Sequence, residues 1–282
     1  MNNPASIDQT SEIILEPGRA ERNYWRDLWH YRELFQVLAA RDVAVRYKQT
    51  VIGIVWAILR PFLTMVIFTV IFSRLAKLPS EGEAPYALMV LAGLLPFTFF
   101  STALTDASSS LINNATLIGK VYFPRLIIPT ATIVVSFVDL MISFAIMVAM
   151  MIWYQFLPSW HIFVLPVFVL LAFLASLGPG LWITALNVKY RDFRYVIPFL
   201  MQFGLYVSPV GFSSSVVPEK WRLLYSLNPI VGVIDGFRWS VLGGKSMIYW
   251  PGLMLSLAVI FFLLWLGVRQ FRKMEKTFAD LI

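Results

Sequence analysis

Few residues of this chain are of types that carry catalytic chemistry. There are no cysteines and only two histidines, His30 and His161, so a thiol nucleophile is excluded and a Cys/His zinc site is not expected. A Ser/His/Asp triad needs a histidine beside its nucleophile, and the two histidines fall at opposite ends of the apolar segments described below. The GxxxxGK run that cradles nucleotide phosphates is also missing. We therefore expect no catalytic residue, no metal site and no cofactor in this chain.

Two charged residues interrupt long apolar segments and are candidates for a transport role. Arg60 precedes Pro61, which predicts a kinked helix, and its guanidinium either faces an aqueous path or reaches to lipid phosphates. Asp139 lies within SFVDLMISF and is either an ion or proton site or a carboxylate hydrogen-bonded between helices. Because no relay of other acids accompanies Asp139, we favour the structural interpretation.

Aromatic side chains form stripes at helical spacing in two segments. The stripes consist of Met65, Phe68, Thr69 and Phe72 in one segment and of Phe199, Gln202, Phe203 and Tyr206 in the other. Aromatic rings stack on the C–H faces of sugars, so such a face of a helix could line a path for a glycan. Helix packing and a lipid-facing aromatic belt give the same periodicity, and spacing alone favours these simpler explanations.

The composition is that of an integral membrane protein. Of the 282 residues, 59% are hydrophobic and 14% are charged, whereas soluble domains carry about 25% charged residues. The mean hydropathy is +0.72. A soluble enzyme is therefore nearly excluded. The net charge of +7 is explained by Lys and Arg collecting in cytoplasmic loops, and no nucleic-acid partner is expected.

Six apolar segments are near or above the length that crosses about 30 Å of hydrocarbon. They cover residues 54–73, 84–104, 126–152, 161–186, 194–212 and 248–268. With both chain ends inside, most Lys and Arg fall on the cytoplasmic side. Residues 1–23 are polar and lack the pattern of a signal peptide, so they predict a flexible cytoplasmic tail. We expect an all-α transmembrane domain at 41–282 with six transmembrane helices and both termini in the cytoplasm.

Two further segments are amphipathic and too interrupted to be spans. Residues 24–40 place Trp25 and Trp29 with other aromatic residues on one side of a helical wheel, which predicts a helix in the membrane interface. Residues 213–247 are broken by charges and by Asn228-Pro229, which predicts two short helices. We interpret 213–247 as a re-entrant hairpin on the outer face, because such backbone is tolerated where protein or a wet cavity covers it. Gly232 and Gly236 would permit close helix contact there.

Two cytoplasmic loops have the features of docking surfaces. Asp106–Lys120 combines Ser, Asn and Thr caps with a short apolar stripe and predicts a short helix parallel to the membrane. Lys189–Arg194 predicts a compact charged turn between the fourth and fifth spans. On pattern alone, both are more typical of solvated loops.

Several ordered blocks resemble the permease subunits of type 2 ABC exporters that move lipid-linked polysaccharides, including O-antigen and teichoic acid. The blocks are RELFQVLAARDVAVRYKQTVIGIVWAILRPF at 32–62, LAGLLPFTFF at 91–100, NNATLIGKVYFPRLIIP at 113–129, LNVKYRDFRYVIPFLMQFGLYVSPVGF at 186–212 and VPEKWRLLYSLNPIVGVIDGFRW at 217–239. Together they cover much of the chain in order, and they are more specific than any single short motif.

The resemblance implies a bacterial inner-membrane permease made of two copies of this chain. Two copies of a P-loop subunit would bind ATP and Mg²⁺ below it, and a polyprenyl-pyrophosphate-linked glycan would pass between the permeases. The residues implied to line the path are Arg60, Phe62, Met65, Phe68, Phe72, Phe199, Gln202, Phe203 and Tyr206. Those implied to couple to the ATPase are Asp106, Ser109, Asn113, Asn114, Lys120, Arg191 and Asp192. The external gate would contain Glu219, Trp221, Arg222, Asn228, Pro229, Asp235 and Arg238, and lipid headgroups would pass Arg41, Arg46 and Lys48.

Two alternatives remain at this point. A membrane transferase that uses a polyprenyl-linked sugar would explain the basic and aromatic residues, but the chain lacks the acidic pair or metal-ligand cluster that such chemistry normally requires. A type 2 permease for drugs or small lipids would share the fold, and the quoted blocks argue against it.

Overall fold

The computed structural model describes residues 24–47, 51–244, 246 and 248–278, and in this part of the chain every regular element is helical. The predicted all-α class is therefore confirmed for the described residues. The longer helices are α3 (Arg32–Tyr47), α4 (Val51–Phe68), α5 (Tyr86–Asn113), α7 (Ile127–Trp153), α8 (Leu165–Lys189), α9 (Phe193–Val207), α11 (Pro229–Val241) and α12 (Trp250–Glu275). The shorter ones are α2 (Tyr24–His30), η1 (Thr69–Leu75), α6 (Ala115–Ile118), η2 (Trp160–Val164), η3 (Ser214–Val216) and α10 (Glu219–Tyr225).

Five helical stretches in the described residues are long and apolar enough to cross a membrane. They are Val55–Leu75, Tyr86–Asn113, Ile127–Trp153, Trp160–Lys189 and Trp250–Glu275. The remaining predicted span, 194–212, corresponds to α9, which has 15 residues and is about 22 Å long. The predicted end at 212 is wrong because Pro209 disfavours a helical conformation of the residue before it, and Ser208 is extended.

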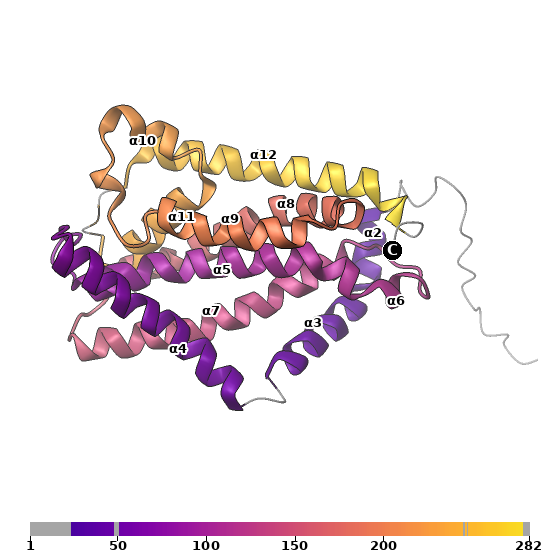
Figure 1. Cartoon of the computed structure of the whole chain (residues 1–282), viewed down its shortest axis with the longest axis horizontal. Coiled ribbons are helices and arrows are strands. Elements are labelled where there is room, and N and C mark those ends of the chain that lie inside the picture. The colour runs from indigo at the N-terminus through magenta and orange to yellow at the C-terminus, as the bar shows by residue number, and fades with distance from the viewer. Residues whose placement is uncertain (1–23, 48–50, 245, 247, 279–282) are drawn as a thin grey trace, which may run out of the picture.

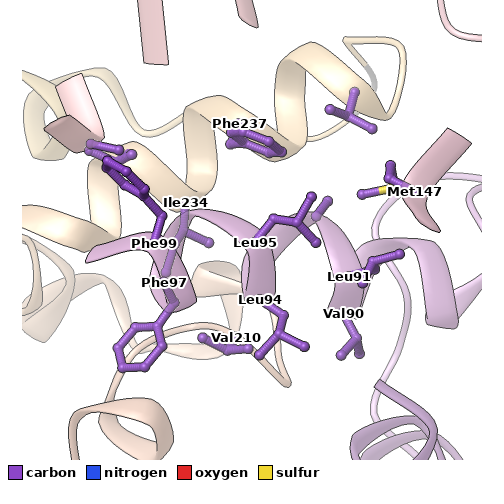
Figure 2. Close-up of a cluster of buried hydrophobic side chains, with 14 of the residues drawn as sticks. Val90, Leu91, Leu94, Leu95, Phe97, Phe99, Met147, Val210, Ile234 and Phe237 are labelled. Atoms are coloured by element: carbon purple, nitrogen blue, oxygen red, sulfur yellow. The ribbon is translucent and has the colours of Figure 1, made fainter. Parts of the chain in front are cut away.

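The bundle is organised around α5. In the most apolar 18-residue stretch of α5, 83% of the residues are buried. The helix packs against α7, α8, α9 and α11. Figure 2 shows Leu91 and Leu95 of α5 among side chains that include Met147 of α7 and Phe237 of α11. In contrast, only 17% of the corresponding stretch within Val55–Leu75, which comprises most of α4 together with η1, is buried. Helix α4 runs obliquely along the bundle in Figure 1. The apolar surface of α4 therefore has to be covered by lipid or by another protein.

Glycines let three helices pack with almost no space between them. A Cβ at Gly178 of α8 would lie 2.6 Å from the backbone nitrogen of Leu264 in α12. Gly232 of α11 faces Ser256 of α12, and Gly236 faces the Phe168 ring of α8. The predicted close contact through Gly232 and Gly236 is thus present, and it places α11 between α8 and α12.

The two ends of the bundle carry different short elements. In Figure 1, α2, α6 and the C-terminal end of α12 lie at one end, and α10 lies at the other. We call these the α6 end and the α10 end. The segment predicted as one interfacial helix at 24–40 consists of α2 and α3, which are interrupted at Tyr31 and continue to Tyr47. Trp25 and Trp29 are exposed, while Tyr24 is buried.

Candidate functional site

The predicted docking segment Asp106–Lys120 begins within α5. The expected separate helix is only α6, since α5 continues to Asn113. The serines that the pattern predicted as caps do not cap a new helix: Ser108 and Ser110 donate their hydroxyls to the carbonyls of Thr105 and Ala107, one turn back in α5, at 2.6 and 2.7 Å. Asn113 and Lys120 are exposed and Ser109 is half-buried, so part of this segment is open to a partner.

An arginine of α3 ties the last turns of α5 to the middle of α7. Arg46 contacts Asp106 through Nη1 at 3.0 Å and Asp139 through Nη2 at 2.8 Å. Tyr47 donates its hydroxyl to the other carboxylate oxygen of Asp139. Asp139 is therefore a carboxylate bonded between helices, as the structural interpretation predicted, and Arg46 is the cationic partner that the local sequence did not reveal. Burial and the Asp139 carboxylate raise the pKa of Tyr47, so it keeps its proton.

Two buried side chains of α8 attach to the same turn of α5. Thr184 donates its hydroxyl to the Ala107 carbonyl at 2.7 Å, and Asn187 donates its amide to the Ser108 carbonyl at 2.8 Å. Both side chains are fully buried. The turn at Asp106–Ser108 is thus bonded to α3 and α8 directly and to α7 through Arg46. We call these contacts the α5 junction.

Two of the three basic residues expected to meet lipid headgroups contact protein groups in the single chain. Arg41 donates to the Asn114 side-chain oxygen at 2.8 Å and pairs with Asp42. Arg46 belongs to the α5 junction, and Lys48 lies outside the described residues. The structure therefore brings the predicted headgroup residues together with the predicted docking segment. Arg191 and Asp192 are exposed in the turn between α8 and α9.

The two aromatic stripes have opposite environments in the single chain. On α9, Phe199, Phe203 and Tyr206 are each more than 60% exposed, and Gln202 is exposed among them. On α4, Met65 and Phe68 are buried, whereas Arg60 and Phe62 are exposed. The stripes meet where the Phe68 ring lies 6.1 Å from the Tyr206 ring and 5.4 Å from the half-buried Phe72 ring. Part of the predicted α4 face is thus covered by this chain, while the α9 face is open.

A fully buried arginine organises the α10 end. Arg238 of α11 donates to the carbonyl oxygens of Met89, Val210 and Phe212 at 3.2, 2.8 and 2.9 Å and pairs with Glu81 at 3.3 Å. These contacts, which we call the Arg238 cluster, join the segment after α9 to the start of α5. Tyr86 fixes the same segment by donating to the Gly211 carbonyl at 2.6 Å. The sequence pattern singled out Arg238, but it gave no indication of Glu81 or Tyr86.

Asn228 and Pro229 separate α10 from α11, as predicted. Pro229 occupies the first helical position, where its missing N–H costs no hydrogen bond, and Asn228 accepts from the Ile230 amide at 3.3 Å. The Asn228 side chain also donates to Ser208 at 3.1 Å. Glu219 and Trp221 are exposed on α10, so they are available to the surroundings of the bundle.

A small polar cavity lies between α10, α11 and α12. Its volume of about 10 Å³ has room for one water, and its lining includes Ser214, Arg222, Tyr225 and Asp235. Burial raises the pKa of Asp235 to about 7, although Arg238 and a hydrogen bond from Ser214 oppose the change. Arg222 is held over the Tyr249 ring and donates to the Ser215 carbonyl at 3.0 Å. The carboxyl of Asp235 therefore titrates near neutrality.

The arrangement is that of a helical membrane domain with several apolar helices. Within the described ranges, no three His, Asp or Glu side chains gather as metal ligands would. The chain belongs to the ABC-2 type transporter family, which matches residues 33–242. Proteins of this family are transporters rather than enzymes.

Two relatives with the same name cover nearly the whole chain. It is 26% identical to the O-antigen export system permease protein RfbA of Myxococcus xanthus, over 91% of this chain and 98% of the relative. Identity to a Klebsiella pneumoniae protein of the same name is also 26%, over 91% and 97%. The inner membrane transport permease YadH of Escherichia coli K12 is 27% identical over 65% of this chain and 74% of its own length.

Proposed function

We propose that this chain is the permease subunit of an ATP-driven exporter that moves a polyprenyl-pyrophosphate-linked, O-antigen-like polysaccharide across the bacterial inner membrane. The observation that carries the proposal is the nearly full-length similarity to permeases named for O-antigen export. ATP and Mg²⁺ would bind to a separate P-loop subunit, two copies of which would serve two copies of this chain.

The proposed topology has six spans with both termini in the cytoplasm. Helix α9 would be the shortest span, and its far end would be completed by the segment that the Arg238 cluster holds. Segment 213–247 would be a re-entrant hairpin acting as an external gate. Its support is that Trp221, Leu223 and Leu224 are about half exposed on α10, an unfavourable arrangement in water and a suitable one in lipid.

The glycan path would form between two copies, along α4 and α9. The exposed rings of Phe199, Phe203 and Tyr206 would stack on successive sugars, and Gln202 would bond to hydroxyls. Because aromatic rings stack on the C–H faces of many different sugars, such a path would not be limited to one sugar sequence. In the dimer, Arg60 and Phe62 of α4 would line the same path, and Phe68 would support Tyr206 from behind.

The α5 junction would transmit movement from the ATPase. Asp106–Lys120, with Arg191 and Asp192, would dock on the ATP-binding subunit, and a displacement of the docked segment would reach α3, α7 and α8 through the bonds of Arg46, Thr184 and Asn187. ATP drives this change only if it binds the transporter's states with different affinities, so tight docking is required. Arg41, Arg46 and Lys48 would lie near the passing pyrophosphate.

The proposal is tested by purifying the chain from its native membrane and identifying co-eluting proteins by mass spectrometry. We expect a P-loop subunit at one-to-one stoichiometry, and ATP-dependent movement of a labelled glycan lipid after reconstitution. The Phe199→Ala/Phe203→Ala variant should hydrolyse ATP and lose transport, while Phe262→Ala, an exposed ring on α12, should retain both. A chain that runs alone and processes a lipid-linked sugar without ATP would contradict the proposal and support a transferase.

A further inference from the structure

An open groove separates α2 from the last turns of α12 at the α6 end. Its volume is about 460 Å³, and Trp25 of α2 forms one wall. The other wall is one face of α12, formed by Phe261, Leu264, Trp265 and Arg269 among others. Trp25, Phe261 and Trp265 are each more than half exposed. The groove is therefore accessible from the surroundings of the bundle.

The lining changes from apolar to cationic along α12. Phe261 and Leu264 lie near the middle of α12, and Arg269 and Arg272 follow about 12 and 16 Å further along the helix from Phe261. This separation matches the step from the upper acyl chain of a lipid to its headgroup. A purely apolar groove could hold either a lipid or a protein helix. The change from apolar to cationic residues along α12 favours a lipid with an anionic headgroup.

Both guanidinium groups are held in place by aromatic rings. The guanidinium of Arg269 lies 5.2 Å from the centre of the Trp265 ring, and that of Arg272 lies 4.7 Å from the centre of the Tyr24 ring. Such cation–π contacts orient the planar donors, which are well suited to phosphate oxygens. Glu275, one turn beyond Arg272, accepts a hydrogen bond from the Arg125 amide at 2.8 Å, and its carboxylate also interacts electrostatically with Arg272.

We propose that the groove binds one anionic phospholipid from the leaflet at the α6 end, which is the cytoplasmic leaflet in the proposed topology. The phosphate would contact Arg269 and Arg272, and an acyl chain would lie on Phe261 and Leu264 beneath Trp25. The bound lipid would bridge α2 and α12. A zwitterionic lipid would bind less tightly, because its own ammonium group offsets the attraction of its phosphate to the two arginines.

The test uses the delipidated complex in detergent and native mass spectrometry with equal amounts of phosphatidylglycerol and phosphatidylethanolamine. We expect preferential retention of phosphatidylglycerol and a loss of about 30-fold in the Arg269→Gln/Arg272→Gln variant, since each basic residue near anionic lipid contributes about five-fold. Trp25→Ala should also weaken retention without changing charge. If the double variant does not fold, the single variant of the exposed Arg269 should lose about five-fold.

The matched control is Lys189→Gln/Arg194→Gln. It removes two positive charges and two cation–π contacts, on Tyr190 and Tyr195, away from the groove. It should retain phosphatidylglycerol like the unmodified chain. Equal retention of both phospholipids, equal loss in the control, or displacement of phosphatidylglycerol by polyprenyl phosphate at the same concentration would overturn the proposal.

Discussion

Replacing Arg238 by methionine should destabilise the α10 end more than a change to any exposed charge there. The side chain is 0% exposed and has four acceptors, of which Glu81 is a carboxylate that is itself only 11% exposed. Methionine fills similar space but leaves that carboxylate without its cation. Removing one partner of a buried ion pair typically costs about 3 to 5 kcal/mol. For a chain of this size, that energy predicts a fall in the thermal midpoint of roughly 6 to 20 °C.

The measurement is thermal unfolding of the purified chain in one detergent, followed by intrinsic fluorescence. Glu81→Gln should cost less than Arg238→Met, because the guanidinium keeps its three carbonyl acceptors. The double variant should recover part of the loss, because no unpaired carboxylate remains. Lys220→Met removes an exposed cation from α10 and should shift the midpoint by no more than about 1 °C.

Hydrogen exchange would locate the effect. Amides of residues 208–213 should exchange faster in Arg238→Met, because the carbonyls of Val210 and Phe212 lose their donors. A midpoint within about 2 °C of the unmodified chain would refute the assignment of a 3 to 5 kcal/mol penalty to this pair. So would faster exchange confined to the α6 end.

Three further predictions concern other parts of the bundle. Because the pKa of Asp235 is raised from 3.8 to about 7, the folded chain binds the Asp235 proton more tightly than the unfolded chain does. The thermal midpoint should therefore fall as the pH rises from about 4 to about 7. Asp235→Asn should reduce this pH dependence of the midpoint, whereas an unchanged dependence would assign the effect to another group. Gly178→Val should abolish the folded peak in size-exclusion chromatography of detergent extracts, because the new side chain would overlap the α12 backbone, while Gly119→Ala, with its nearest neighbour 3.8 Å away, should be tolerated. Thr184→Val keeps the side-chain volume and removes the hydrogen bond to α5, which should lower the free energy of unfolding by about 1 kcal/mol. The variant should also move less glycan per ATP hydrolysed in the reconstituted complex. An unchanged ratio would show that the α5 junction does not lie on the coupling route.

Hydropathy and helical periodicity predicted much of the fold, because lipid-facing and buried helices are both long and apolar. Periodicity also found the open aromatic face of α9. The errors have local causes. Pro209 ends α9 at Val207, and the serines that predicted caps bond within α5, which continues to Asn113. The steric effect of Pro209 could be read from the sequence, whereas the serine bonds depend on which backbone carbonyl is in reach, which composition does not reveal.

The polar contacts of the site were beyond sequence reasoning. Tyr47 and Asp139 are 92 residues apart in the chain, and no local pattern indicates that they meet. Thr184 and Asn187 are isolated polar residues in an apolar helix, where a solvent-facing and a buried position give the same pattern. Arg41 and Arg46 lie in a basic segment that suggested headgroups, and only the packing of α3 reveals their protein partners.

The deep burial of α5 also bears on how the chain is inserted during synthesis. This helix enters the bilayer before α8, α11 and α12 have been made, so for a time the surface that they later cover must face lipid. Its hydroxyl groups are suited to that interval, because Thr98, Thr102, Ser108 and Ser110 all donate to carbonyls of α5 itself. These four hydroxyls therefore need no partner from a later helix, and the later helices can be added around α5 in the order in which the ribosome delivers them.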